Sequence, residues 1–216
     1  ISDSLKPAAA EKQKPQQDWG KKLFKIAGQK GSTEGGLYED KDNGKKYYVK
    51  FPGKERAQME HLAARLYALA GVPVAETEVF QVAGKDAIKS SWLEGSQSMT
   101  ALQMKARPEV GKNFAIDAWL GNYDVVGLEF DNIVNVDGNA HRIDTGGSLM
   151  FRAQGKLKEF THSVPELQSM LSSSVAPQAS QVFGGKVPKE MFKEGAEKLS
   201  QIADEQIDSL VKASFP

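Results

Sequence analysis

Apolar and polar positions alternate in short runs up to about residue 95, and turns rich in glycine, asparagine and aspartate separate the runs. Alternation of this kind is typical of strands whose two faces differ in burial. It predicts five strands, at residues 19–26, 37–39, 46–51, 74–82 and 85–93. Asp42-Asn43-Gly44 joins the second and third runs, and Asn-Gly suits the backbone of a tight hairpin. The pattern therefore predicts an antiparallel sheet.

One helix interrupts this sheet, at residues 54–70. Its apolar side chains recur every three or four positions: Met59, Leu62, Ala63, Leu66 and Ala70. Gly71 and Pro73 then end the helix. Glu60 borders the apolar stripe, so we expect its carboxylate to reach from the buried side toward a strand. Residues 19–95 are thus predicted to form a small lobe of strands with one helix.

The periodicity becomes helical after Glu94-Gly95-Ser96, where we expect the chain to cross to a second lobe, residues 96–216. Helices are predicted at residues 98–106, 109–121, 163–174 and 189–213, the last with a break near Asp204. A hairpin of residues 133–136 and 140–143 lies among them. The whole pattern predicts a bilobal α+β protein, with a small antiparallel β lobe and a mostly helical second lobe.

Composition limits the classes of function. Lys and Arg number 28, as do Asp and Glu, so net charge gives no electrostatic case for nucleic acid or an anionic membrane. No apolar run approaches the roughly 20 residues of a membrane span. The absence of cysteine excludes disulfides, thiolate nucleophiles and cysteine-based zinc sites. We expect a monomer with no nucleic-acid partner and no transmembrane segment.

Residues 1–18 are rich in Lys, Gln, Ala and Pro and nearly lack large apolar side chains. Such a segment buries too little apolar surface to order itself, so we predict a disordered tail or linker. Together with the initial Ile1, this composition suggests a domain of a longer protein. We expect it to act in the cytoplasm, or to be secreted into a host or target cell as part of a larger effector.

A glycine-rich turn followed by a lysine strand indicates nucleotide binding. Backbone N–H groups in such a turn can cover phosphates, a role we assign to Gly31, Ser32, Gly35 and Gly36. Lys50 lies between Val49 and Phe51, and its side chain faces away from theirs. Paired with Glu60, it would hold the α- and β-phosphates of ATP. The alternatives are an ordinary glycine-rich hairpin and two solvated charges.

Two further parts of a nucleotide site are expected. Backbone groups of Trp92, Leu93 and Glu94, just before the crossing between lobes, would bind the adenine edge. Asn132 and Asp144 flank the predicted hairpin, which returns them to the same end. Carboxylate and amide oxygens are the ligands that Mg²⁺ prefers, so we predict that these two hold Mg²⁺, or alternatively Mn²⁺.

The acceptor side of the site is assigned to Asp124, which would orient a hydroxyl group and take its proton. Asp117, in the preceding predicted helix, is either an orienting residue or part of a buried network. For each single aspartate the alternative is a turn or cap residue. Asp124, Asn132 and Asp144 in this order, downstream of the glycine-rich turn, Lys50 and Glu60, favour the site.

The order of these parts resembles the atypical kinases of the HipA and phosphatidylinositol 3-/4-kinase group, to which actin-fragmin kinase is related. YYVKF resembles their nucleotide-lysine strand, and RAQMEHLAARLYALAGVPV resembles the helix and strand that follow it in HipA-type kinases. DAWLGNYD…DN is similar to the D-x-x-x-x-N-x-D-R-x-x-x-N loop of the lipid kinases, and RIDTGG to their I-D-F-G. The resemblance covers roughly residues 23–152 and implies a protein-kinase-like fold that binds ATP and a divalent metal.

Three features depart from these families. Val125-Val126 stand where the relatives have Arg or Arg-His, and the spacing from Asp124 to Asn132 is longer than theirs. Asp131, next to Asn132, is for that reason an alternative metal ligand. Thr145 replaces the Phe of D-F-G, so an activation switch built on that Phe has no basis here.

The expected activity is ATP- and Mg²⁺-dependent transfer of the γ-phosphoryl group to a hydroxyl, with Lys50, Glu60 and Asp124 as catalytic residues. A protein Ser or Thr is the expected acceptor, because no lipid-binding or basic membrane face is evident. The alternatives are a lipid or small-molecule kinase, a nucleotidyl transferase of the same fold, and a non-catalytic pseudokinase that serves as a binding module. The complete set of site residues argues against the last.

Overall fold

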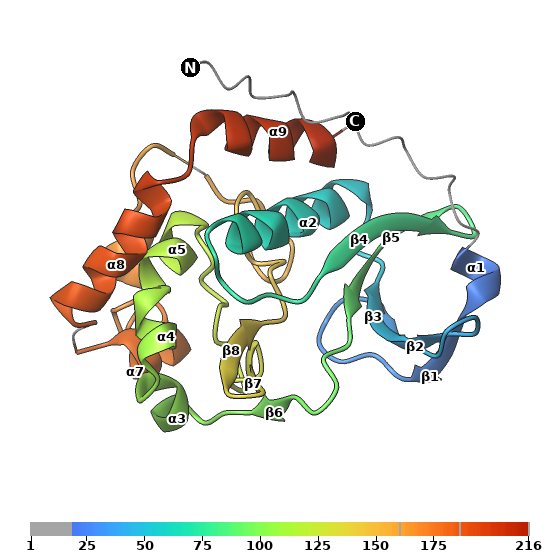
Figure 1. Ribbon diagram of the computed structural model, residues 1–216, viewed down its shortest axis with the longest axis horizontal. Helices are drawn as coiled ribbons and strands as arrows, with labels where there is room; N and C mark the ends of the chain where they lie inside the picture. Colours follow the sequence, from blue (N-terminus) through green and yellow to red (C-terminus); the bar gives the residue numbers. More distant parts are fainter. Residues whose placement is uncertain (1–18, 160, 186, 216) are drawn as a thin grey trace, which may run out of the picture.

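The computed structural model describes residues 19–159, 161–185 and 187–215. It confirms the α+β class: a five-stranded antiparallel sheet with one long helix forms a small lobe, and short helices around a three-stranded sheet form a larger one (Figure 1). The tail predicted at residues 1–18 lies outside the described residues. Within the described ranges, no helix is both long and apolar enough to cross a bilayer.

The sheet of the small lobe has the order β1-β2-β3-β5-β4. Its strands are β1 (Leu23–Ala27), β2 (Gly35–Asp40), β3 (Lys46–Lys50), β4 (Thr77–Val82) and β5 (Lys85–Ser91). The start of the first predicted strand is wrong, because Trp19–Lys22 is a helical turn, α1. Trp19 is buried there against Tyr47 and Phe80, and Lys89 Nζ lies 3.2 Å from its ring centroid. Burial of this ring outweighs the local alternation.

Helix α2 (Lys54–Leu69) joins the two lobes, close to its predicted bounds. One face packs into a cluster with α5 (Phe114–Trp119) and α9 (Asp204–Ser214). The cluster contains Leu62, Ala63, Leu66, Tyr67, Ala70, Val72, Ile116, Leu120 and Leu149, with Leu199, Ile202, Ile207 and Leu210 against it. Figure 1 shows α9 lying along α2. Helix α2 is therefore fixed by apolar contacts with the larger lobe.

The larger lobe holds a sheet of the order β6-β7-β8, from β6 (Gln97–Ser98), β7 (Ile133–Val136) and β8 (Asn139–Arg142). Around it lie α3 (Ala101–Lys105), α4 (Pro108–Lys112), α5, α6 (Glu166–Ser169), α7 (Pro177–Phe183), α8 (Lys189–Ser200) and α9. The second core cluster of the molecule fills this lobe, with Phe114 and Phe183 in ring contact at 4.9 Å.

Several predicted bounds in this lobe are wrong. The helix predicted from residue 98 starts at Ala101, because Gln97 and Ser98 pair with β7 and Thr100 forms a capping box with Gln103. The helix predicted at 109–121 is two helices, α4 and α5, that meet at Asn113. Helix α6 is much shorter than residues 163–174, and α7 was not predicted. The break near Asp204 is confirmed by the gap between α8 and α9.

The fourth strand begins at Thr77 rather than at residue 74 for a reason that connects the lobes. Val74 forms an isolated bridge with Arg142, and Ala75 N donates to Arg142 O at 3.1 Å. The segment after α2 therefore pairs with β8 before it enters the small sheet.

Candidate active site

Lys50 and Glu60 form a buried ion pair between β3 and α2. Lys50 is 8% exposed and Glu60 is 5% exposed, so neither is a solvated surface charge. Lys50 Nζ also donates to Asp144 Oδ1 at 3.1 Å. The structure thus brings together three of the residues selected from the sequence, from a strand, a helix and a loop far apart in the chain.

The glycines of the turn fall into two groups. Gly31 and Ser32 lie in the exposed loop between β1 and β2, and Gly31 adopts a φ of 78°. Gly35 and Gly36 lie in β2, where Gly35 pairs with Lys50 across the sheet. A Cβ at Gly35 would overlap Val49 O, and one at Gly36 would lie 2.6 Å from Ala27 O. Strand packing therefore requires glycine at both positions, beside any role in binding phosphates.

The charges in this trio are strongly coupled. Burial alone would lower the pKa of Lys50, but Asp144 and Glu60 outweigh it and the pKa is raised. Burial opposes ionisation of Asp144, but Lys50 and the Gly146 N–H lower its pKa. Burial raises the pKa of Glu60, with Lys50 acting against it. Lys50 is thus a cation and Asp144 an anion at neutral pH.

Thr145 connects the segment that carries Asp144 to helix α2. Its hydroxyl donates to Glu60 O at 3.0 Å, and Thr145 is 2% exposed. Gly146 N donates to Asp144 Oδ1 at 3.0 Å. A Cβ at Gly146 would lie 2.9 Å from Glu60 Oε2 and 3.2 Å from Asp144 Oδ1, so this close approach favours glycine.

Asp124 lies in the loop after α5, half-buried and held by Asn132. Asn132 Nδ2 donates to Asp124 O at 2.7 Å and to Asp124 Oδ2 at 3.3 Å. Burial, together with the nearby charge of Asp144, raises the pKa of Asp124 to about 6, although the Asn132 bond acts against this. A carboxyl with this pKa is suited to accept a proton near neutral pH.

The longer loop between Asp124 and Asn132 is anchored by its first residues. Val125 and Val126 are 0% and 1% exposed and belong to the core of the larger lobe. Asn132 N returns to Val126 O at 3.4 Å, and Leu128 projects outward with 67% of its surface exposed. Leu128 and Glu129 therefore extend into solvent, and Asp124 stays hydrogen-bonded to Asn132.

Asn132 and Asp144 meet at one end of the β7–β8 hairpin. Ile133 pairs with Arg142, and Ile143 N donates to Asn132 O at 3.1 Å. Asp144 Oδ1 accepts from Lys50 Nζ and Gly146 N, and the Asp144 side chain is 44% exposed, so Oδ2 is available as a further ligand. The Asn132 amide nitrogen is bonded to Asp124, which leaves its Oδ1 as an acceptor.

The oxygen atoms Asp144 Oδ2 and Asn132 Oδ1 fit as ligands of a magnesium ion carried by a nucleotide. Such an ion takes one or two protein ligands and completes its shell with phosphate and water. Across the described part of the chain, no three His, Asp or Glu side chains converge as a ready-made metal cage. Asp131, the alternative ligand, is exposed and its carboxylate lies against Gly127.

Asp117 is not placed for chemistry. It accepts two hydrogen bonds from Arg142, at 3.2 and 2.7 Å, and both side chains are fully buried. Tyr67 OH, with a pKa raised by burial and by Asp117, lies in the same network and accepts from Asn122 Nδ2 at 3.1 Å. Of the two readings of Asp117, the buried network is the one observed.

The segment expected at the adenine edge follows β5. Trp92 N donates to Lys46 O at 3.0 Å, and Glu94 pairs with Lys46 Nζ at 2.9 Å, so backbone and side chain both continue the β3–β5 pairing. Leu93 is half-buried, and its carbonyl accepts from Ser96 N at 3.2 Å. The sequence did not single out Lys158, whose ammonium group lies beside the Asp124 loop.

Sequence and structure comparisons give different results for this chain. No protein-family model and no curated protein matches it. Among solved structures it is similar to the Helicobacter pylori proinflammatory kinase CtkA. That protein is a kinase. The two share 16% identity with a TM-score of 0.48, over 93% of this chain and 98% of the other. What the present site does is inferred from its own geometry.

Proposed function

We propose that this protein is an ATP- and Mg²⁺-dependent phosphotransferase that moves the γ-phosphoryl group of ATP to a hydroxyl acceptor. One observation carries the proposal: Lys50 is held between Glu60 and Asp144, with Asp124 close enough to Asp144 for their charges to interact. A lysine fixed in this way is suited to bind phosphate, and a partly exposed carboxylate beside it is suited to hold the metal of the nucleotide.

Nucleotide binding is assigned to the small lobe and the crossing segment. Gly31 and Ser32 would offer backbone N–H groups to the phosphates, and Gly35 and Gly36 would allow β2 to approach them. Lys50 would bind the α- and β-phosphates. Backbone groups of Trp92, Leu93 and Glu94 would bind the adenine edge, at the boundary between the proposed units 19–95 and 96–216.

Asp144 and Asn132 would hold Mg²⁺, or Mn²⁺, through Asp144 Oδ2 and Asn132 Oδ1, with Asp131 as the alternative ligand. The metal would neutralise charge on the β- and γ-phosphates as it develops. It would also screen Asp124 from Asp144, whose charge now raises the Asp124 pKa. Lys50 remains bonded to Glu60, which keeps its ammonium directed at the phosphates.

The transfer step needs little covalent chemistry from the protein. The acceptor oxygen forms a bond to the γ-phosphorus, the bond from that phosphorus to the β,γ-bridging oxygen breaks, and ADP leaves. Asp124 orients the acceptor hydroxyl and takes its proton late in the step. Asn132 fixes Asp124 for this role through the two hydrogen bonds at 2.7 and 3.3 Å.

A protein Ser or Thr is the proposed acceptor. The net charge of zero offers no attraction to an anionic membrane, which argues against a lipid acceptor at a bilayer surface. We propose a minimal kinase domain similar to the HipA-type and phosphatidylinositol 3-/4-type kinases and suited to a larger effector. The contacts of Lys50 with Glu60 and Asp144, and of Asn132 with Asp124, support this proposal.

The test compares ATP labelled at the γ-phosphorus with ATP labelled at the α-phosphorus, each incubated with protein, Mg²⁺ and a mixed protein substrate. The proposal predicts covalent label from γ-labelled ATP alone. Label from α-labelled ATP would show nucleotidyl transfer instead. Normal ATP binding without label from either would show a binding module, and label that enters lipid or a small molecule would replace the acceptor class.

A further inference from the structure

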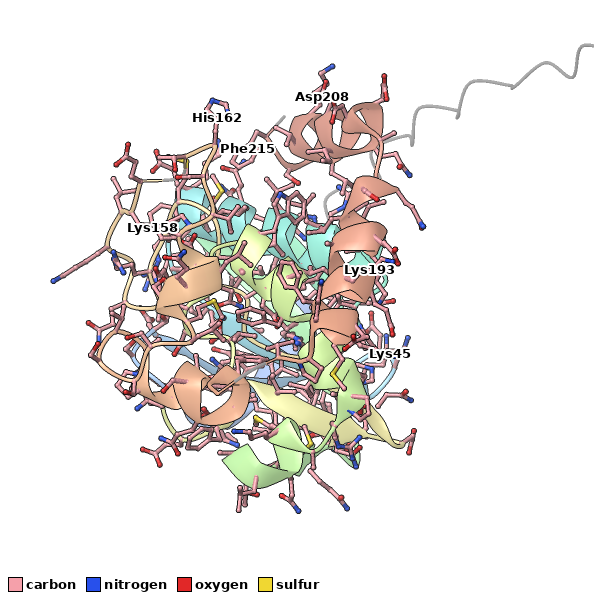
Figure 2. The ribbon with its side chains drawn as sticks, turned by 90° about the vertical axis from the view of Figure 1, so that its left-hand side faces the viewer. Lys45, Lys158, His162, Lys193, Asp208 and Phe215 are labelled. Carbon is pink, nitrogen blue, oxygen red and sulfur yellow. The ribbon has the colours of Figure 1, made fainter. Side chains whose placement is uncertain are left out.

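Lys158 lies on a short hairpin that follows the Asp144 motif. Its backbone N donates to Met150 O at 2.9 Å, and Arg152 N donates to Lys156 O at 2.8 Å. Figure 2 shows Lys158 and His162 on the same side of the larger lobe, with His162 projecting outward. Unlike His162, Lys158 is half-buried, and its side chain turns inward to two backbone carbonyls.

The Lys158 ammonium group connects the two segments that carry the proposed functional aspartates. It donates to Gly121 O, three residues before Asp124. It also donates to Gly147 O at 3.0 Å, three residues after Asp144. One cation thus joins two backbone segments, each at the same sequence distance from its carboxylate.

The segments that Lys158 connects also pack against Asp124 and against each other. A Cβ at Gly147 would lie 3.3 Å from Asp124 Cβ, so Gly147 packs directly on the aspartate. Next to Gly121 and Gly147, Leu149 N donates to Leu120 O at 2.7 Å, and Leu149 has a φ of 55°. Such a conformation is strained for a non-glycine residue and persists where the surroundings fix it. The contact between the Gly121 and Gly147 segments is therefore closely fixed by its surroundings.

The far end of the hairpin reaches helix α2. A Cβ at Gly155 would lie 2.7 Å from Arg56 Cζ, and Arg56 lies one turn before Glu60 on the same face. The hairpin of residues 150–158 thus spans from the Asp124 loop to the helix that carries the partner of Lys50.

Burying an ammonium group at this place opposes folding. Burial lowers the pKa of Lys158 to about 8, Glu166 acts against this effect, and Arg152 adds to it. The Glu166 carboxylate lies on the same side of Gly121, since Lys158 Nζ and Glu166 Oε1 lie 3.0 and 3.4 Å from the point that a Cβ at Gly121 would occupy. The centroid of the Tyr123 ring lies 5.8 Å from the amine. In this position the amine aligns the carbonyl groups of Gly121 and Gly147.

We propose that Lys158 is the positioning residue of this site: through Gly121 and Gly147 it sets the distance between Asp124 and Asp144. Its amine acts through these two backbone carbonyl groups. This inference rests on the phosphotransferase function proposed above, and it assigns that function a residue outside the motifs of the sequence.

The test uses Lys158→Met, Lys158→Arg and, as a matched control, Lys156→Met on the exposed strand of the same hairpin. Lys158→Met is expected to lower kcat at least tenfold, since a misplacement of about 1 Å can cost a hundredfold. The dissociation constant for Mg²⁺·ATP should stay within about threefold, because Lys50 and the metal ligands are intact. Arginine, which keeps several donors, should restore most of kcat, and Lys156→Met should change neither quantity.

A second readout does not depend on activity. Amide hydrogen exchange is followed on the intact protein in peptides covering residues 119–126 and 144–149. Both should exchange faster in Lys158→Met and remain as in wild type in Lys156→Met. If Lys158→Met does not fold, Lys158→Gln is read in the same way, because its shorter amide cannot span both carbonyls.

The outcomes separate the two proposals. A wild type that transfers no phosphoryl group defeats the proposed function, and exchange then decides the role of Lys158. Unchanged exchange in both peptides overturns that role whether or not the wild type is active. In an active protein, unchanged kcat for Lys158→Met, or a loss of kcat that arginine does not restore, overturns it as well.

Discussion

Arg142 of β8 and Asp117 of α5 form a doubly hydrogen-bonded ion pair, at 3.2 and 2.7 Å, in which neither side chain has exposed surface. The pair joins the strand before Asp144 to the helix before Asp124. A buried pair of this kind holds the two segments together, because removing one partner leaves an uncompensated charge in a dry environment.

Asp117→Asn is therefore expected to reduce the free energy of unfolding by about 3–5 kcal/mol, as measured by urea titration. Asp137→Asn, at the exposed turn of the same hairpin, is the control and should change stability little. Mg²⁺·ATP affinity per folded molecule should not change in Asp117→Asn. A variant of normal stability that has lost phosphoryl transfer would instead show that Asp117 takes part in the reaction.

Thr145 offers a matched pair of substitutions. Thr145→Val removes the hydroxyl that donates to Glu60 O at 3.0 Å and leaves a buried carbonyl without that donor. We expect a loss of about 1–3 kcal/mol in unfolding free energy and weaker Mg²⁺·ATP binding. Thr145→Ser keeps the donor and should retain most of both. Equal behaviour of the two variants in urea titration and calorimetry would contradict the role given to the hydroxyl.

Lys50→Met tests the phosphate-binding group. The methionine keeps the length of the side chain but leaves Glu60 and Asp144 without their shared cation. Mg²⁺·ATP affinity should fall at least tenfold, or about 1.4 kcal/mol, in calorimetric titration. Lys45→Met, at an exposed position five residues earlier, should bind as wild type does. Unchanged affinity in Lys50→Met would remove Lys50 from the site.

Asp144→Asn should alter the metal dependence of binding in a defined direction. In wild type, chelation of Mg²⁺ should weaken ATP binding. In Asp144→Asn, Mg²⁺ should have little effect, and metal-free ATP should bind at least as tightly as to wild type, because a carboxylate beside the phosphates has been neutralised. Titrations with a fluorescent ATP analogue, with and without Mg²⁺, measure this. A wild-type response to Mg²⁺ would exclude Asp144 as a ligand.

The fold class and the pairing of Lys50 with Glu60 were predictable because both follow from local patterns. Alternation placed Lys50 on the face opposite Val49, and helical spacing placed Glu60 beside an apolar stripe. Likewise, the two strands of a hairpin bring residues at its open end together, which placed Asn132 near Asp144. In each case, the geometry of one short element was sufficient.

Contacts between distant segments were not predictable in this way. Nothing in the sequence near Lys158 indicates that its amine meets Gly121 and Gly147, since the contact depends on how the hairpin folds back. Local alternation assigned Trp19 to a strand, and this was wrong because the helical turn depends on burial of Trp19 against Phe80, a tertiary contact. Helix α6 is likewise shorter than its periodicity predicts, because the residues before Glu166 and after Ser169 form bends and turns.

The central claim is that Asp124 acts on the acceptor while Lys50 and Asp144 bind the nucleotide. Single-turnover transfer from γ-labelled ATP, measured for wild type, Asp124→Asn and the exposed-turn control Asp137→Asn, tests it most directly. We predict that Asp124→Asn transfers phosphoryl 10²–10⁴-fold more slowly, the range typical for loss of a general base, and binds Mg²⁺·ATP within about threefold of wild type. Asp137→Asn should match wild type in both. Transfer by Asp124→Asn at the wild-type rate would contradict the account.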